Sequence, residues 1–256
     1  MAMNKYTVVI RCKNEARWLP DCRKGLGLQS AGPTDVIFVD SGSTDGSKEL
    51  AASFGWSLVK YPKNEAFNYS KALNIGLEEC ETEYALLLSA HCLLASVHSV
   101  SRLLSTASRQ GAAGVFGRQL PTSQSHPIDV RDLLTVFGRE RIVYCQHPFF
   151  HNAFSLIRKD IWLRHRFDEQ INGIEDRLWA KSVAAEGHKI IYEPSACVYH
   201  EHGLNQSSCE IRASRVVEAL VHLHNDDGCL CSNPASFDVD TQEKFIEYDS
   251  CLPFLG

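Results

Sequence analysis

The sequence has little that would direct the chain out of the cell or into a membrane. Its start, from Met1 to Ile10, passes directly into an apolar strand and lacks the apolar region and small-residue cleavage site of a signal peptide. The most apolar stretch, residues 84–95, has only about half the length that crosses a bilayer, and it contains a histidine. We therefore expect a cytoplasmic protein, at most peripheral at the inner face of a membrane.

Cysteine is too sparse and too irregularly spaced for a disulfide scaffold. The chain has 10 cysteines in 256 residues. The close pair Cys229 and Cys231 lacks the C-x-x-C spacing of zinc knuckles and redox motifs. We expect mostly reduced thiols that pack as small apolar side chains.

Basic residues are not in excess, and two nucleotide motifs are missing. The 31 acidic and 26 basic residues give a formal charge of -5, which disfavours nucleic acid as a partner but leaves room for a small basic nucleotide pocket. The segment Arg11-Cys-Lys-Asn-Glu15 has no glycine, so it lacks the G-x-G-x-x-G loop of nicotinamide dehydrogenases. The same lack of glycine disfavours a sugar-phosphate nucleotidylyltransferase.

Short β-branched runs alternate with helical patterns, which predicts an α/β fold with parallel strands and crossover helices. The apolar share of 44% supports a sizeable core. The expected strands are 7–11, 36–40, 57–61, 84–89, 114–118, 189–193 and 196–200. The expected helices are 16–25, 47–54, 68–80, 97–110, 174–186 and 208–223. Residues 121–148 have a mixed pattern that suggests an excursion over the surface.

Ligands of open parallel sheets bind beyond the carboxyl ends of the strands, and polar residues follow several of the expected strands. After the second strand comes Asp40-Ser-Gly-Ser-Thr-Asp-Gly46, where a carboxylate could accept from a nucleobase and small residues let a ligand approach the backbone. By residue type alone, the stronger interpretation is that Ser43, Thr44 and Asp45 are N-caps of the helix that begins near Ser47.

Four segments in order resemble the family 2 glycosyltransferases of the GT-A fold. They are Asn14-Glu15, Val39-Asp-Ser-Gly-Ser-Thr-Asp-Gly-Ser47, the helix start from Asn68 to Asn74, and Ser89-Ala-His91 at the place of a D-x-D motif. Their order and spacing agree with the family over residues 5–205. The resemblance implies a three-layer, Rossmann-like fold with a mostly parallel central sheet between helices.

The resemblance also implies a donor site. Asp40 would contact the nucleobase, residues 11–15 would line the nucleoside pocket, and Asp45 or Lys71 would help to position it. Lys71 and Asn74 would share a helix face toward a phosphate or ribose, although a solvated face is the alternative. The donor-binding positions implied are Arg11, Lys13, Asn14, Glu15, Asp40, Ser41, Gly42, Asp45, Asn68, Lys71, Ser89 and Ala90.

The expected metal site departs from the family pattern, because Ser89 and His91 replace the two aspartates. The arrangement resembles the D-x-H version of the polypeptide N-acetylgalactosaminyltransferases, and His200 or His202 would supply the late histidine. Imidazole suits Mn²⁺ better than Mg²⁺. The alternatives are histidines packed in the core, or a pyrophosphate held by Arg or Lys with weak or no metal binding.

Residues 173–180 resemble the E-D-x-x-[LFW] signature of the family. This match implies Asp176 as the general base and Glu175 as a neighbour that binds the acceptor or orients the site. The alternative is that both only complement the helix dipole. His151 and Asn152 stand where the family lines the donor sugar and acceptor, and Trp179 is expected in the core.

The resemblance thus implies an inverting enzyme that transfers a sugar from a UDP- or dTDP-sugar to a saccharide or glycolipid hydroxyl in polysaccharide or surface-glycan synthesis. The alternative is a nucleotide-sugar-binding or scaffold domain that has lost turnover, for which Ser89 is the main argument. We expect a transferase domain over residues 1–205, with a nucleotide-sugar half (1–120) and an acceptor half (121–205), followed by a helix and tail (206–256).

Overall fold

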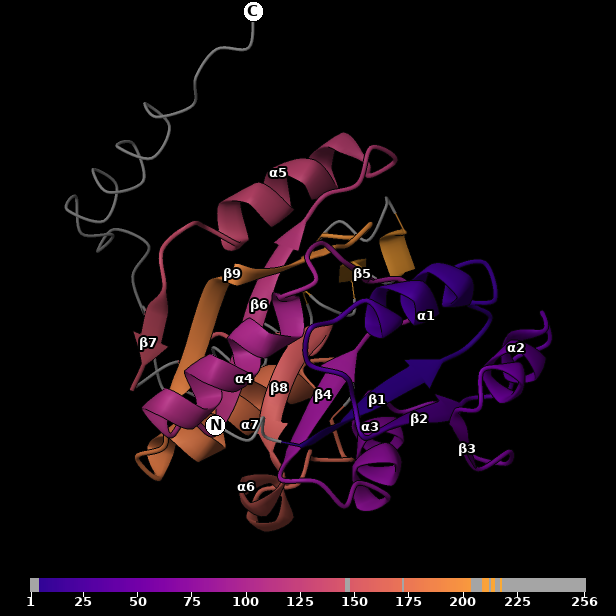
Figure 1. The fold of residues 1–256 in the computed structure, drawn as a ribbon, viewed down its shortest axis with the longest axis horizontal. Helices are drawn as coiled ribbons and strands as arrows, with labels where there is room; N and C mark the ends of the chain where they lie inside the picture. The colour runs from indigo at the N-terminus through magenta and orange to yellow at the C-terminus, as the bar shows by residue number, and fades with distance from the viewer. Residues whose placement is uncertain are drawn as a thin grey trace, which may run out of the picture. The chain divides into compact units, whose positions relative to one another are not determined.

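The computed structural model describes residues 5–145, 148–171, 173–203, 209–211, 213, 214 and 217, which form alternating strands and helices (Figure 1). All of them lie in the unit Met1–Val217. The predicted C-terminal helix and tail fall mostly outside the described residues, so the domain division at residue 205 stays a prediction. No helix among these residues is long and apolar enough to cross a membrane.

The first half of the chain forms parallel strands with helices between them, as the sequence predicts. The strands β2, β1 and β4 lie side by side, and Val9 of β1 is paired with Ile37 on one side and Leu87 on the other. The elements of this half are β1 (Tyr6–Cys12), α1 (Leu19–Gly27), β2 (Asp35–Asp40), α2 (Ser47–Ser53), β3 (Ser57–Lys60), α3 (Tyr69–Glu78) and β4 (Tyr84–Leu88).

The second half adds antiparallel strands to the same sheet. Its elements are β5 (Leu93–Leu94), α4 (Ser99–Gln110), β6 (Gly114–Leu120), α5 (Pro127–Val136), β7 (Ile142–Tyr144), β8 (Phe154–Arg158), α6 (Lys159–Arg164), α7 (Glu175–Ala185) and β9 (Ile190–Tyr199). The strand order is β3-β2-β1-β4-β8-β6-β9-β5, with β7 paired to β9. Strand β8 runs antiparallel between β4 and β6, while β6 and β9 are parallel.

Two details of the second half differ from the prediction. The two strands expected at 189–193 and 196–200 are one strand, β9, whose pairing with β6 shifts between Gly117 and Arg118. Pro194 lies at this shift and has no amide for the ladder, which is why the sequence suggested a break. The stretch 121–148 is not wholly a surface excursion, because Leu133 and Phe137 are buried against the sheet.

Helices cover both faces of the sheet, which confirms the predicted three-layer arrangement (Figure 1). Side chains alternate along β1, so Val8 and Ile10 pack with α1, α2 and α4, whereas Val9 packs with α3, α6 and α7. Gly76 lets α3 lie close to the sheet, since a Cβ there would stand 2.5 Å from Val9. Trp179 is 2% exposed in the core on the Val9 side of the sheet, as expected.

Candidate active site

The turn after β2 is built around Asp40. Its carboxylate is 6% exposed and accepts from the backbone amides of Gly42 and Ser43 at 3.2 and 3.1 Å. Gly42 has φ of 90°, a conformation that side chains rarely adopt. The carboxylate therefore shapes the turn in the absence of a ligand, and a base contact would use its remaining acceptor capacity.

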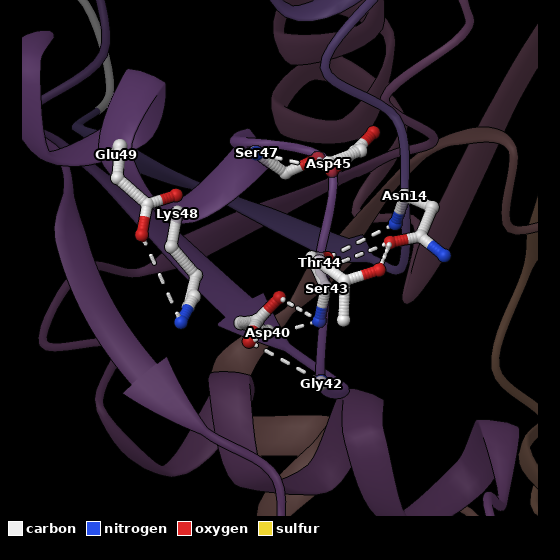
Figure 2. Close-up of polar contacts among 9 residues, drawn as sticks. All are labelled: Asn14, Asp40, Gly42, Ser43, Thr44, Asp45, Ser47, Lys48 and Glu49. Atoms are coloured by element: carbon white, nitrogen blue, oxygen red, sulfur yellow. Dashed lines mark hydrogen bonds and ion pairs between the residues drawn. The ribbon is translucent and has the colours of Figure 1, made fainter.

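A network of hydrogen bonds joins this turn to the loop after β1 (Figure 2). Asn14, at φ of 58°, donates its backbone N–H to Ser43 Oγ at 3.0 Å, and its side-chain Oδ1 accepts from Thr44 N at 2.8 Å. Asp45 accepts from Ala16 N at 2.9 Å and from the Ser47 hydroxyl at 2.6 Å. The polar residues of the two motifs thus bind one another, and Asp45 holds the loops together as well as flanking α2.

The remaining residues that the sequence predicts for the donor site lie in different surroundings. Arg11 lies 4.2 Å above the ring of Tyr69, Lys13 is exposed, and the Ser41 hydroxyl is buried without a partner among the described residues. Asn68 caps α3 through Lys71 N at 2.8 Å, and the Lys71 ammonium pairs with Glu65.

Asn74 does not share the solvent-facing side of Lys71. It is 2% exposed, and its amide donates to Phe167 O at 2.9 Å and accepts from Trp162 Nε1 at 3.1 Å. The proposed approach of Asn74 to a phosphate is therefore wrong, because every polar atom of its side chain is used to attach α3 to the chain around α6.

The segment Ser89-Ala90 lies at the end of β4 and belongs to the protein interior. Ser89 is 7% exposed and Ala90 is 1% exposed, and Ser89 N donates to Ala153 O at 3.0 Å. Any contact of these two residues with a donor would use the backbone. The turn they form directs His91 toward the ends of β1 and β9.

The structure brings together the three histidines that the sequence singled out for a metal site. His91 Nε2 lies 3.1 Å from His200 Nε2, with the two rings stacked at an interplanar angle of 11°. The ring of His202 lies 5.2 Å from that of His91. Glu15, which the sequence predicts for the nucleoside pocket, contacts His91 Nδ1 through Oε1 at 3.1 Å. Burial and the neighbouring His91 hold the pKa of His200 well below its usual range, so its ring is neutral.

This cluster fits a divalent cation with few protein ligands. Two nitrogen ligands at about 2.1 Å on adjacent octahedral positions stand about 3.0 Å apart, close to the observed spacing of His91 and His200. The Glu15 carboxylate would fix the proton of His91 on Nδ1 and leave Nε2 for a metal. No group of three or more His, Cys, Asp or Glu that could hold a metal occurs within the described ranges. The other ligands would have to come from a donor and water.

The predicted acid pair begins α7. Glu175 is 4% exposed, and Asp176 accepts from Asn152 N at 3.2 Å and from Arg177 N at 2.8 Å. Burial and the charge of Asp176 raise the pKa of Glu175 to about 7, and burial raises that of Asp176 too. The bond to Asn152 ties the start of α7 to the segment just before β8.

A pocket opens beside Asp176, between α5, α7 and the end of β6. His151, Arg177 and His202 line it together with the aromatic rings of Phe137 and Phe149. Gln119 Nε2 lies within hydrogen-bond distance of His151 Nδ1, at 3.0 Å. Burial, and after it the charge of Arg177, lowers the pKa of His151 to about 3. Asn152 is 4% exposed, and its buried side-chain amide lies beside Glu175, whose pKa this contact lowers against the effect of burial.

Sequence reasoning missed Gln119 and Arg177 as members of this site. Gln119 lies on β6, in a strand whose pattern marks only which face is buried. Arg177 follows the acid pair and reads as an ordinary charged residue of a first helical turn. Only the fold shows that both reach the pocket.

Residues 7–164 match the family model described as glycosyl transferase family 2. The chain belongs to this family. The match ends before α7, so the matched region of this family 2 glycosyltransferase does not include Asp176.

Relatives and solved structures agree with the assignment. The chain is 24% identical over 213 residues to the O-antigen chain rhamnosyltransferase WbaN of Salmonella anatum, covering 78% of this chain and 67% of the relative. It superposes on the mannosyltransferase PcManGT from Pyrobaculum calidifontis, in complex with GDP-Man and Mn²⁺, with a TM-score of 0.62 at 16% identity over 98% and 81% of the two chains. Mannosyl-3-phosphoglycerate synthase from Rubrobacter xylanophilus gives 0.65 at 14% identity over 92% and 80%. These likenesses confirm the GT-A fold of this family 2 enzyme.

Proposed function

We propose that this family 2 enzyme is an inverting glycosyltransferase that moves a sugar from a UDP- or dTDP-sugar to a hydroxyl of a saccharide or glycolipid. The named activity of the Salmonella anatum relative supports a place in polysaccharide or surface-glycan synthesis. Location in the cytoplasm, with peripheral membrane contact for a glycolipid acceptor, stays a prediction.

The observation that carries this proposal is the position of Asp176. Its carboxylate lines the pocket, is tied to the start of β8 through Asn152, and shares the sheet edge with the His91–His200 pair. A hydroxyl in the pocket would therefore have a base on one side and the donor diphosphate near the strand ends on the other.

The chemistry follows from these positions. Asp176 takes the proton of the acceptor hydroxyl, whose oxygen forms a bond to the anomeric carbon while the bond from that carbon to the diphosphate oxygen breaks. The electron pair leaves with the nucleoside diphosphate. Burial supports this role, because the raised pKa of Asp176 makes it a stronger base. When bound, Mn²⁺ held by His91 and His200 would neutralise charge on the diphosphate.

The test is the variant Asp176→Asn, assayed for transfer against a panel of UDP- and dTDP-sugars with Mn²⁺. Loss of a positioned base should lower kcat by about 10²–10⁴-fold. Calorimetry should show unchanged donor-nucleotide binding, because the strand ends that we assign to the nucleotide are untouched. Asp21→Asn, an exposed change on α1, is the matched control. Turnover retained in the Asp176 variant would refute the assignment.

A binding or scaffold domain without turnover is the second candidate, and Ser89 favours it. The residue is buried and offers no carboxylate where the family has one. Such a domain would be stabilised by its nucleotide sugar, by about 2.7 kcal/mol at 100 times the dissociation constant, yet would neither hydrolyse nor transfer it. Thermal shift and product assays, each with and without Mn²⁺, separate the two candidates.

A further inference from the structure

Two N–H groups converge on one nitrogen of His151. Gln119 Nε2 lies 3.0 Å from Nδ1, and the backbone amide of Ala153 donates to the same atom at 3.2 Å. The orientation of a glutamine amide can be reversed in a structure, but a backbone N–H cannot. Nδ1 must therefore be the unprotonated nitrogen, and the ring proton lies on Nε2.

The opposite nitrogen is left for a ligand. The two hydrogen bonds that the His151 ring makes with the described residues are both at Nδ1. The ring lines the same pocket as Asp176, and the aromatic ring of Phe137 packs edge-on at 6.0 Å. An imidazole in this state can donate from Nε2 but cannot accept there.

We propose that Gln119 is a positioning residue that holds His151 as a hydrogen-bond donor only, and that His151 Nε2–H binds an oxygen of the acceptor sugar beside the hydroxyl that Asp176 deprotonates. This inference rests on the proposed function for the identity of the ligand. It excludes His151 as the base, since the lone pair of its ring faces Gln119 and Ala153. It also predicts that the acceptor presents an oxygen lone pair to His151.

The first test reads the proton position and needs no substrate. In the full chain labelled with ¹⁵N-histidine, the signals of His151 are identified by their absence in His151→Gln. We expect an unprotonated Nδ1 and a protonated Nε2 at neutral pH. A proton on Nδ1 would overturn the proposal whether or not the chain transfers sugar.

The variant Gln119→Glu tests the role of the glutamine. A carboxylate there can only accept, so it opposes the Ala153 amide and should raise the fraction of His151 rings that carry a proton on Nδ1. Gln124→Glu, at an exposed position of the following loop, is the control and should leave His151 as in the parent protein. An Nδ1 that stays unprotonated in Gln119→Glu would show that Gln119 does not set the state of the ring.

The second test uses kinetics with methyl glycosides of hexoses as acceptors. His151→Phe removes the donor and should lower kcat/KM for the acceptor by about tenfold or more, whereas His151→Gln keeps an N–H near Nε2 and should recover much of the loss. His98→Phe, an exposed change at the start of α4, should behave as the parent. Equal losses in both His151 variants would overturn the donor role. Absence of transfer in the parent chain would instead refute the proposed function, and the proton measurement would still decide the state of His151.

Discussion

The Nε2 atoms of His91 and His200 lie 3.1 Å apart, although 109 residues separate them in the sequence. One follows β4 and the other follows β9, and Glu15 from the end of β1 contacts the far nitrogen of His91. Three strand ends thus build one cluster. The spacing of the two nitrogens is compatible with two adjacent ligands of one metal ion, and the metal site stays a prediction.

We expect His91→Ala to weaken Mn²⁺ binding in the presence of UDP by at least about tenfold, because only His200 and the nucleotide would then hold the ion. Isothermal titration calorimetry measures the affinity. His98→Ala, a histidine at the start of α4, is the control and should bind as the parent does. Equal affinity in His91→Ala and the parent would remove His91 from the site.

We expect Glu15→Gln to lower Mn²⁺ affinity by about 10- to 100-fold, since it removes the charge that orients His91 and makes it a better ligand. The same titration with UDP measures this effect. The melting temperature without metal should change little, because Glu15 is partly exposed. A fall in stability without a loss of metal affinity would assign Glu15 a structural role only.

We expect Glu175→Gln to stabilise the protein at pH 8 but not at pH 5. The pKa of Glu175 is raised to about 7 from 4.5, so the folded state binds a proton that the unfolded state releases, and stability falls as pH rises between these values. Glutamine removes this loss. Scanning calorimetry should show a melting temperature at pH 8 that is higher than that of the parent by at least about 2 °C. For a chain of this size, a shift of about 2 °C corresponds to roughly 0.5–1 kcal/mol. Glu79→Gln, a change at an exposed position, is the control and should show no such pH dependence. Absence of the pH dependence in Glu175→Gln would show that the Glu175 carboxylate is solvated and contradict the prediction.

We expect Asn74→Ala to destabilise the fold by about 2 kcal/mol or more, because Trp162 Nε1 and Phe167 N would lose their buried acceptor. The melting temperature should fall by about 4–8 °C. UDP binding measured below the transition should be unchanged. Lys71→Ala, three residues earlier on α3, removes only a surface ion pair and should barely change the melting temperature. Weakened UDP binding in folded Asn74→Ala would restore the phosphate role that burial argues against.

Local patterns predicted the first half of the fold well because each of its strands is an apolar run closed by polar residues. Strand β4 and helix α4 are examples, each found within about two residues of the expected bounds. Strand β8 is absent from the strands that the sequence predicts, and nothing in Phe154–Arg158 indicates that it runs antiparallel between β4 and β6. Pairing direction depends on partners distant in sequence, and local propensity carries no information about it.

The candidate site divides in the same way. The sequence determined which residue types follow the strands, and ends of parallel strands meet at one edge of a sheet, which with the family resemblance was sufficient to select His91 and His200. Asp176 was selected by the family signature at the start of α7. Only the tertiary structure decided what each side chain touches. It turned Glu15 toward His91, buried Asn74 against Trp162, and brought Gln119 to His151. These contacts join residues 76, 88 and 32 positions apart, and hydrogen bonds over such separations are set by the packing of whole elements, which no local pattern records.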